Sequence, residues 1–238
     1  MEKKKKRIIF FGLLVISFIF ASILLSPGIQ GYDQYTTHPG LTDEIVTFYN
    51  ASYTDHLSDQ EKEWTIQGSI DEDLPPRWIN HFYDPTTGEG WKGENLGWLP
   101  GTALRALSKV FLNATTAILS SKNWAEDEVA QLQYADYGGN QTWQAALRRY
   151  ATGDKQGAFT SLGHIVHLLE DATVPDHTRN DTHVHELSGI TLDGGSPYED
   201  YAQQFTRSNL TTANDLKRKN TRPLELASLD NYFANLAN

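Results

Sequence analysis

Hydrophobic positions recur with a helical spacing along much of the chain after residue 100. Between Thr102 and Ser121, apolar residues are separated by alternating steps of three and four, as on one face of an α-helix. The residues of this stripe are Leu104, Leu107, Phe111, Ala114 and Ile118. Similar patterns predict further helices over 125–135, 141–151 and 155–172.

Two helices are predicted before residue 71. The first begins near Leu41, in a stretch where Thr42 is a candidate N-cap and two acidic residues follow in the first turn. His38 then lies in the loop before this helix. The second helix is marked by Ser58 and Glu61, which have the spacing of a capping box, and it should end at Gly68.

The next stretch, DEDLPPRWINHFYDPTTGEGWKGENLGWLP at 71–100, has no sustained period and predicts a long loop. Its many aromatic side chains have apolar area to bury, which argues against disorder. No part of the chain alternates in the manner of a strand. The predicted fold class is therefore all-α, a compact multi-helix domain with long aromatic-rich loops.

A hydrophobic leader precedes this domain. A basic cluster at 3–7 is followed by eighteen uncharged, mostly apolar residues at 8–25, a length between those of a signal peptide's apolar region and a membrane-spanning helix. We expect 1–31 to be a helical signal peptide or membrane anchor. Residues 32–238 would then lie outside the cytoplasm, secreted or membrane-anchored. The helical pattern of SLDNYFANLAN ends without an obvious cap, so a C-terminally incomplete domain is one interpretation.

Charge and composition narrow the chemistry that this domain can perform. The 238 residues include 20 basic and 30 acidic side chains, a net charge of −10, which argues against blanket neutralisation of nucleic acid phosphates. The chain has no cysteine, which excludes disulfides and thiolate zinc sites. A metal site would consist of His, Asp and Glu side chains, and an anionic substrate would have to be bound locally.

The segment LGHIVHLLEDATVPDH concentrates such ligands on one predicted helix. The apolar stripe of that helix consists of Ala158, Leu162, Ile165 and Leu169. His164, His167 and Asp171 fall on the opposite face. His167 and Asp171 are four residues apart, which brings two side chains to one point, and His177 can turn back after a proline ends the helix. The alternative is an ordinary amphipathic helix with a solvated, histidine-rich face.

Three separated segments resemble the zinc-dependent phospholipase C family, whose all-helical fold is shared with fungal single-strand nucleases. TTHPGLT is similar to the segment with the family's early histidine, and GSIDEDLPPRWINHFYDP resembles its glycine, acid and HFYDP element. LGHIVHLLEDATVPDH matches the core motif H-x3-D-x5-H. The segments occur in the family's order, and together the matches span about 36–201.

The resemblance implies a set of zinc ligands. One ion would be surrounded by four side chains: Asp73, His81, His167 and Asp171. Asp171 would also bridge to a second ion bound by His38. In the first set, Asp71 competes with Asp73 for the position of the family's acid.

A third ion is implied by the end of the match. Its ligands would be His177, Glu199 and a further histidine, for which His183 is the first choice and His185 the reserve. His56 and His164 have no predicted role. If His183 is the ligand, His185 has none either. We interpret such histidines as surface or hydrogen-bonded residues.

The resemblance implies an exported zinc-dependent phosphoric diester hydrolase of the phospholipase C type, which uses two to three zinc ions to activate water. Asp73 is the expected catalytic residue, able to ligate zinc and to orient or deprotonate the water. The expected partners are a phospholipid or other phosphodiester substrate and a membrane surface, and the protein is expected to be a monomer. Nucleic acid is the alternative substrate, for a single-strand nuclease. A catalytically silent, zinc-stabilised binding domain is the alternative from outside the enzyme class.

Aromatic residues of the long loop are candidates to line the substrate cleft. They are Trp78, Tyr83, Trp91 and Trp98. Core packing is the alternative use of these side chains, and it is the commoner one.

Overall fold

The computed structural model describes residues 32–74, 77–92, 118–179, 181, 186–187, 190–191 and 196–238. The leader at 1–31 and nearly all of the helix expected at 102–121 lie outside these residues. None of the helices in the described part of the chain combines the length and the hydrophobicity that a membrane span requires.

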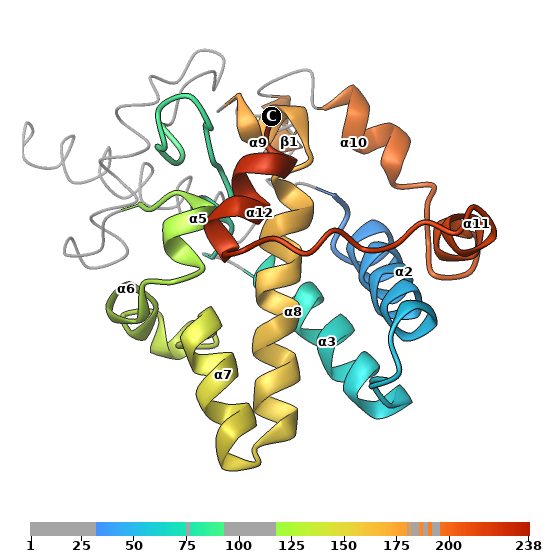
Figure 1. The fold of residues 1–238 in the computed structure, drawn as a ribbon. Coiled ribbons are helices and arrows are strands. Elements are labelled where there is room, and N and C mark those ends of the chain that lie inside the picture. Colours follow the sequence, from blue (N-terminus) through green and yellow to red (C-terminus); the bar gives the residue numbers. More distant parts are fainter. Residues whose placement is uncertain are drawn as a thin grey trace, which may run out of the picture.

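Helix α8 (Lys155–Asp171) lies at the centre of the molecule, and the other helices pack around it (Figure 1). Its most extensive contacts are with α3 (Asp59–Glu72) on one side and α7 (Trp143–Thr152) on the other. Helix α2 (Thr37–Ser52) packs against α3 and α8. The helical fold class is confirmed.

The polar face of α8 is buried at least as completely as its apolar stripe. His164, His167 and Asp171 are at most 2% exposed, whereas two leucines of the stripe remain partly exposed. The solvated, histidine-rich face considered as an alternative is therefore wrong. The reason is that α2 and α3 pack against α8 and their polar groups meet its histidines.

Helix α3 shows both a confirmed and a corrected prediction. The Ser58 side chain accepts a hydrogen bond from the N–H of Glu61, and the Glu61 carboxylate accepts one from the N–H of Ser58, so the capping box is confirmed. The predicted stop at Gly68 is wrong, because the helix continues to Glu72.

Gly68 instead permits a close approach between α3 and α8. A Cβ atom at Gly68 would collide with the carbonyl oxygen of Thr160, and one at Gly163 would collide with that of Thr65. The two helices therefore touch backbone to backbone, as only glycine allows. This approach brings the end of α3 beside the histidines of α8.

Helix α2 begins at Thr37, earlier than the predicted start near Leu41. The turn before it is closed by Asp33, whose carboxylate accepts hydrogen bonds from the N–H groups of Tyr35 and Thr36. Consequently His38 lies in the first turn of a helix instead of a loop. Thr42 is not the cap. It lies inside the helix and is fully buried.

Shorter elements lie between α3 and α7. The predicted loop contains a 3-10 helix, η1 (Arg77–Asn80). In place of one helix over 125–135, the chain forms α5 (Ser121–Trp124), α6 (Glu128–Leu132) and the 3-10 helix η2 (Ala135–Tyr137). The break occurs because the Asp127 side chain accepts a hydrogen bond from the N–H of Ala130 and starts a new helix.

After α8 the chain forms α9 (Pro175–Thr178), a two-residue antiparallel hairpin and three further helices. The hairpin pairs β1 (Glu186–Leu187) with β2 (Ile190–Thr191) and is the one strand pairing in the described part of the chain, where none was predicted. The helices are α10 (Pro197–Ala202), α11 (Thr212–Arg218) and α12 (Leu229–Leu236).

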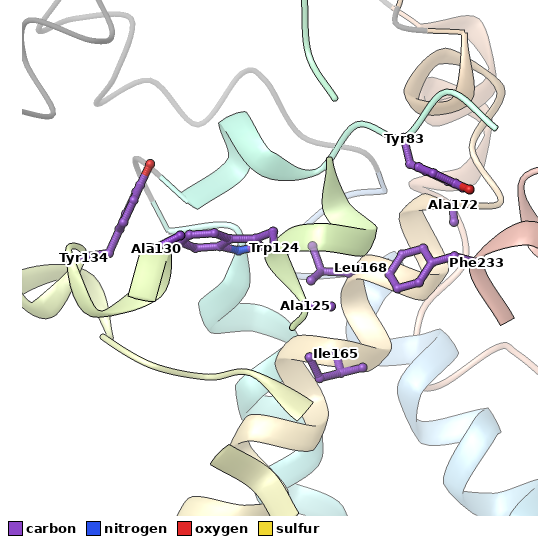
Figure 2. Packing of buried hydrophobic residues seen from close by; sticks show 9 residues of the cluster. All are labelled: Tyr83, Trp124, Ala125, Ala130, Tyr134, Ile165, Leu168, Ala172 and Phe233. Carbon is purple, nitrogen blue, oxygen red and sulfur yellow. The ribbon is translucent and has the colours of Figure 1, made fainter. Parts of the chain in front are cut away.

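A hydrophobic cluster packs against one side of α8, between α5, α6 and α12. Figure 2 shows Phe233 of α12 beside Leu168 and Ala172, with Trp124 farther along the cluster. The Trp124 ring meets that of Tyr134 edge to face, with centroids 4.8 Å apart. The cluster packs Ile165 and Leu168 of α8 on a face other than the one that meets α3, so the polar side chains near the end of α8 project from a tightly packed helix.

Candidate metal centre

Imidazole and carboxylate side chains from six segments converge near the C-terminal end of α8. The contributing segments are α2, the end of α3, the residues after η1, α8 itself, α9 and α10. The side chains that meet there are His38, Asp73, His81, His167, Asp171, His177 and Glu199. All seven are buried, and six of them are at most 1% exposed.

The carboxylate of Asp171 lies among four imidazole rings. The nearest is His81, whose Nδ1 atom is 2.8 Å from Oδ2 of Asp171. The other three rings approach the same carboxylate as follows: His167 Nε2 at 3.3 Å, His38 Nε2 at 3.4 Å and His177 Nδ1 at 3.5 Å. Asp171 is thus the common neighbour of four of the histidines that the family resemblance singled out.

Asp73 supplies a second carboxylate facing the same rings. Its Oδ1 atom lies 3.5 Å from Nε2 of His167 and 3.7 Å from Nδ1 of His81, and its Oδ2 atom lies 4.0 Å from Nε2 of His38. Within the described residues, neither oxygen of Asp73 has a hydrogen-bond partner. A buried carboxylate left in this state is costly, and a coordinated cation would compensate both oxygens.

Two overlapping groups have the geometry to hold a divalent metal ion. One consists of His38, Asp73 and His167, and the other of His81, His167 and Asp171. In each group the potential ligand atoms lie within 4.8 Å of one another. The donor set of imidazole nitrogen and carboxylate oxygen fits a transition metal ion such as zinc in a chain without cysteine.

A further pair lies beside these groups. The Nε2 atom of His177 is 3.8 Å from Oε1 of Glu199, and the His177 ring stacks on Phe82 with centroids 4.6 Å apart. The pair joins α9 to α10. His183 and His185, the alternatives for a third ligand here, lie outside the described residues.

Two of the central histidines have a hydrogen-bond partner on the ring nitrogen that faces away from the two aspartates, and a third, His81, has a carboxylate nearby but beyond hydrogen-bonding distance. His38 Nδ1 is 2.6 Å from Glu170 Oε2, and His167 Nδ1 is 2.7 Å from the carbonyl oxygen of Ser69. His81 Nε2 is 3.6 Å from Glu72 Oε1. In metal sites, such outer partners fix the ring orientation and the tautomer of ligating histidines.

The charges of the centre move the pKa values of the two aspartates in opposite directions. Burial raises the pKa of Asp73. Burial acts in the same sense on Asp171, but the neighbouring imidazoles of His177 and His167 outweigh it and hold the pKa of that carboxyl well below its usual range. Asp171 is thus the ionised carboxylate around which the histidines gather.

Burial lowers the pKa of His81, but the carboxylates of Asp171 and Glu72 outweigh it and raise this pKa to about 9. At His164, burial dominates over the hydrogen bond to Glu72 and lowers the pKa. The two histidines lie on different sides of Glu72, and only His81 faces the aspartates.

Tyr32 lies against the centre on the side of α10. Its ring meets that of His38 edge to face at 5.6 Å, and its hydroxyl lies 3.1 Å from that of Thr173 and 2.7 Å from that of Tyr198. Because the Thr173 hydroxyl donates to the carbonyl oxygen of Glu170, Tyr32 must donate to Thr173 and Tyr198 to Tyr32. This chain of hydroxyls joins α10 to the end of α8.

The structure separates several of the alternatives that the sequence left open. Asp73 faces the centre, whereas Asp71 is partly exposed and accepts a hydrogen bond from Gln67. His164 is a hydrogen-bonded histidine, as expected, with Glu72 as its partner, and His56 is exposed.

The aromatic residues that were candidates to line a substrate cleft pack in the core instead, which was the alternative. Trp78, Tyr83 and Trp91 are 2%, 6% and 1% exposed, so they are core residues. Trp78 and Trp91 pack edge to face at 5.8 Å, and Tyr83 belongs to the cluster around Phe233. Trp98 lies outside the described residues.

Sequence reasoning missed the two glutamates behind the histidines. Each directly precedes a predicted ligand in sequence: Glu72 before Asp73, and Glu170 before Asp171. Successive residues near a helix end project about 100° apart, so one acid of each pair faces the centre and the other faces the outer side of a histidine. The repeated Glu-Asp pair was the signal that could have revealed them.

In comparisons with known proteins, no family model matches this chain, and no curated protein matches it at a significant level.

Proposed function

We propose that this protein is an exported zinc-dependent phosphodiesterase that hydrolyses phospholipids in the manner of a phospholipase C. The observation that carries the proposal is the convergence of His81, His167 and Asp171 with His38 and Asp73 in one buried centre. These residues come from the three sequence segments that resemble that family. Two to three zinc ions would be held by this centre and by the adjacent His177 and Glu199.

The residues present suit this chemistry. When bound, a zinc cluster would supply an activated water and offset the negative charge of the phosphate. Asp73 is the candidate base, because both of its oxygens face the centre without a hydrogen-bond partner in the described residues. Its side chain could therefore orient a water molecule and accept its proton. The Glu170 carboxylate and the Ser69 carbonyl would keep His38 and His167 in place during the reaction.

The overall charge is compatible with a phosphodiester substrate under one condition. A chain with a formal charge of −10 repels phosphate in general, so the attraction has to be local. Several divalent ions concentrated in one buried site would provide it. The acidic surface would then disfavour long polyanions more than a single lipid headgroup, which supports a phospholipid ahead of single-stranded nucleic acid.

Paired assays test the proposal. The full chain, purified in detergent and supplied with zinc, is incubated with phosphatidylcholine micelles and separately with single-stranded DNA. We expect release of phosphocholine, which stops on chelation and returns when zinc is added. Cleavage of DNA alone would favour the nuclease, and a zinc-loaded protein that cleaves neither substrate would favour a silent binding domain.

The variants Asp73→Asn and Asp71→Asn provide a matched pair for this assay. Both remove one charge from the same short stretch, but only Asp73 faces the centre. We expect Asp73→Asn to lose about 10²–10⁴-fold in turnover, as for other general bases, and Asp71→Asn to retain it. Equal activity of the two variants would remove Asp73 from the mechanism.

A further inference from the structure

Glu170 is a buried acid whose two carboxylate oxygens both face α2. Its Oε2 atom lies 2.6 Å from Nδ1 of His38, and its Oε1 atom accepts a hydrogen bond of 2.9 Å from the hydroxyl of Thr42. Glu170 is 5% exposed, and neither bond involves a lysine or arginine. Because burying a carboxylate is unfavourable, this arrangement calls for a role that an apolar residue could not fill.

The other ring nitrogen of His38 faces the metal centre. Its Nε2 atom is 3.4 Å from Oδ1 of Asp171 and 4.0 Å from Oδ2 of Asp73, and it has no hydrogen-bond partner within the described residues. The ring also stacks on that of His167 at 3.7 Å. Successive residues at the end of α8, Glu170 and Asp171, thus approach opposite nitrogens of one imidazole.

We propose that Glu170 is a positioning residue of the metal centre, which fixes His38 as the ligand of the group formed with Asp73 and His167. By accepting a hydrogen bond from the Nδ1–H group, it holds the ring in one orientation and leaves the Nε2 lone pair directed at that group. The inference rests on the proposed function only in requiring that the centre binds a metal ion. It does not depend on which phosphodiester is hydrolysed.

A purely structural role, joining α2 to α8, can be separated from this one. Thr42 makes the same connection between the two helices through the same carboxylate, but it bonds to Oε1, whereas His38 lies against Oε2. The variant Thr42→Val therefore removes a buried link and leaves the His38 contact in place. If the role is structural, variants of Thr42 and Glu170 should change metal binding to a similar extent. If Glu170 positions His38, only the Glu170 variants should weaken metal binding.

The experiment measures the affinity of the full chain for Zn²⁺ by competition with a chromophoric chelator, in the wild type and three variants. Loss of outer partners in metal sites weakens binding by about 10–100-fold, and we expect this for Glu170→Leu. Glu170→Gln keeps an acceptor for His38 and loses only the charge, so its affinity should lie between those of Glu170→Leu and wild type. Thr42→Val should bind zinc as wild type does, although it unfolds at a lower denaturant concentration.

A second readout reports on the ring directly. In ¹⁵N-histidine NMR spectra of the zinc-loaded protein, His38 of the wild type and of Glu170→Gln should show a protonated Nδ1 and a metal-bound Nε2. Glu170→Leu should lose this pattern. If Glu170→Leu does not fold, the comparison of Glu170→Gln with Thr42→Val decides, because only the former should bind zinc more weakly than wild type.

The inference is overturned if a folded Glu170→Leu binds zinc with wild-type affinity, if Thr42→Val loses as much affinity as Glu170→Leu, or if the wild type binds no zinc. Absence of phospholipid hydrolysis by a zinc-loaded wild type would reject the proposed function alone. The two ideas therefore fail through different measurements.

Discussion

The Nδ1 atom of His81 lies 2.8 Å from Oδ2 of Asp171, so the chain after η1 meets the end of α8 through an imidazole and a carboxylate. Both side chains are buried, and His167 shares the same carboxylate oxygen at 3.3 Å. The relationship makes Asp171 the residue on which the charge balance of the centre depends.

Asp171→Asn is therefore expected to lose at least one zinc ion per chain. An amide oxygen is a weaker ligand than a carboxylate and leaves the surrounding histidines without their counter-charge. Metal content after dialysis against a weak chelator, measured by atomic emission, checks this. Asp200→Asn, an exposed acid of α10, serves as the control and should keep the wild-type content. Full retention of zinc by Asp171→Asn would exclude it as a ligand.

The close approach of α3 and α8 predicts that one added methyl group between them lowers the stability of the protein strongly. Gly163→Ala would place its Cβ against the backbone of Thr65, which cannot move without shifting the whole helix. We expect a loss of roughly 1–3 kcal/mol or more in the free energy of unfolding, measured in urea. Gly157→Ala on the same helix meets side-chain atoms of Asp154 and Arg149 in place of backbone, and because side chains can shift more easily than a helix backbone it should cost less than Gly163→Ala. Equal stabilities would contradict the packing described.

The buried ion pair of Arg77 and Glu72 predicts that the stability of the protein depends strongly on the arginine. The Nε atom of Arg77 donates to Oε2 of Glu72 at 2.8 Å, and both residues are at most 1% exposed. Arg77→Met would leave a buried carboxylate without its main counter-charge, at a cost of about 3–5 kcal/mol in chemical unfolding. Arg148→Met removes an exposed partner of Glu128 and should cost less than about 1 kcal/mol. A small effect at Arg77 would show that Glu72 is compensated in another way.

The capping box of α3 predicts a pH-dependent contribution to stability. Hydrogen bonds from Lys155 and from the backbone of Ser58 lower the pKa of Glu61 to about 2, from an ordinary value of 4.5. A carboxyl whose pKa is lowered by folding stabilises the protein above its unfolded pKa, and this contribution is lost as the pH falls toward the folded value. The stability difference between wild type and Glu61→Gln should therefore be full above about pH 5 and shrink toward pH 2.

This difference is measured by urea unfolding between pH 6 and pH 2, in steps of about one pH unit. Glu63→Gln is the control, because Glu63 lies on the exposed side of the same helix and pairs with Arg207 at the surface. Its difference from wild type should stay small throughout. A difference for Glu61→Gln that does not change with pH would contradict the lowered pKa.

Local signals in the sequence were sufficient for part of the fold. Ser58 and Glu61 start α3 as predicted, because a capping box involves only neighbouring residues. The period of 155–172 predicts α8 to within one residue, and the pattern of 141–151 predicts α7 to within two. The spacing of His167 and Asp171 on one helix likewise predicts that they share a site, and their side chains do meet.

Other features depend on tertiary partners and could not be read locally. Gly68 has the appearance of a helix stop, but its function is to let α8 approach, which requires knowing that Gly163 lies opposite. The polar face of α8 is buried because Glu72 and the Ser69 carbonyl of α3 hydrogen-bond to His164 and His167, and no periodicity reveals such partners. The break at Asp127 was missed because its capping role competes with a helical pattern that continues across it.

The zinc content of the purified protein tests the central claim most directly. Native mass spectrometry of the full chain, released from detergent after equilibration with micromolar zinc and removal of excess metal, would count the bound ions. The structure and the family resemblance together predict two to three zinc ions per chain. A folded protein that retains none would contradict the metal centre and, with it, the proposed hydrolase.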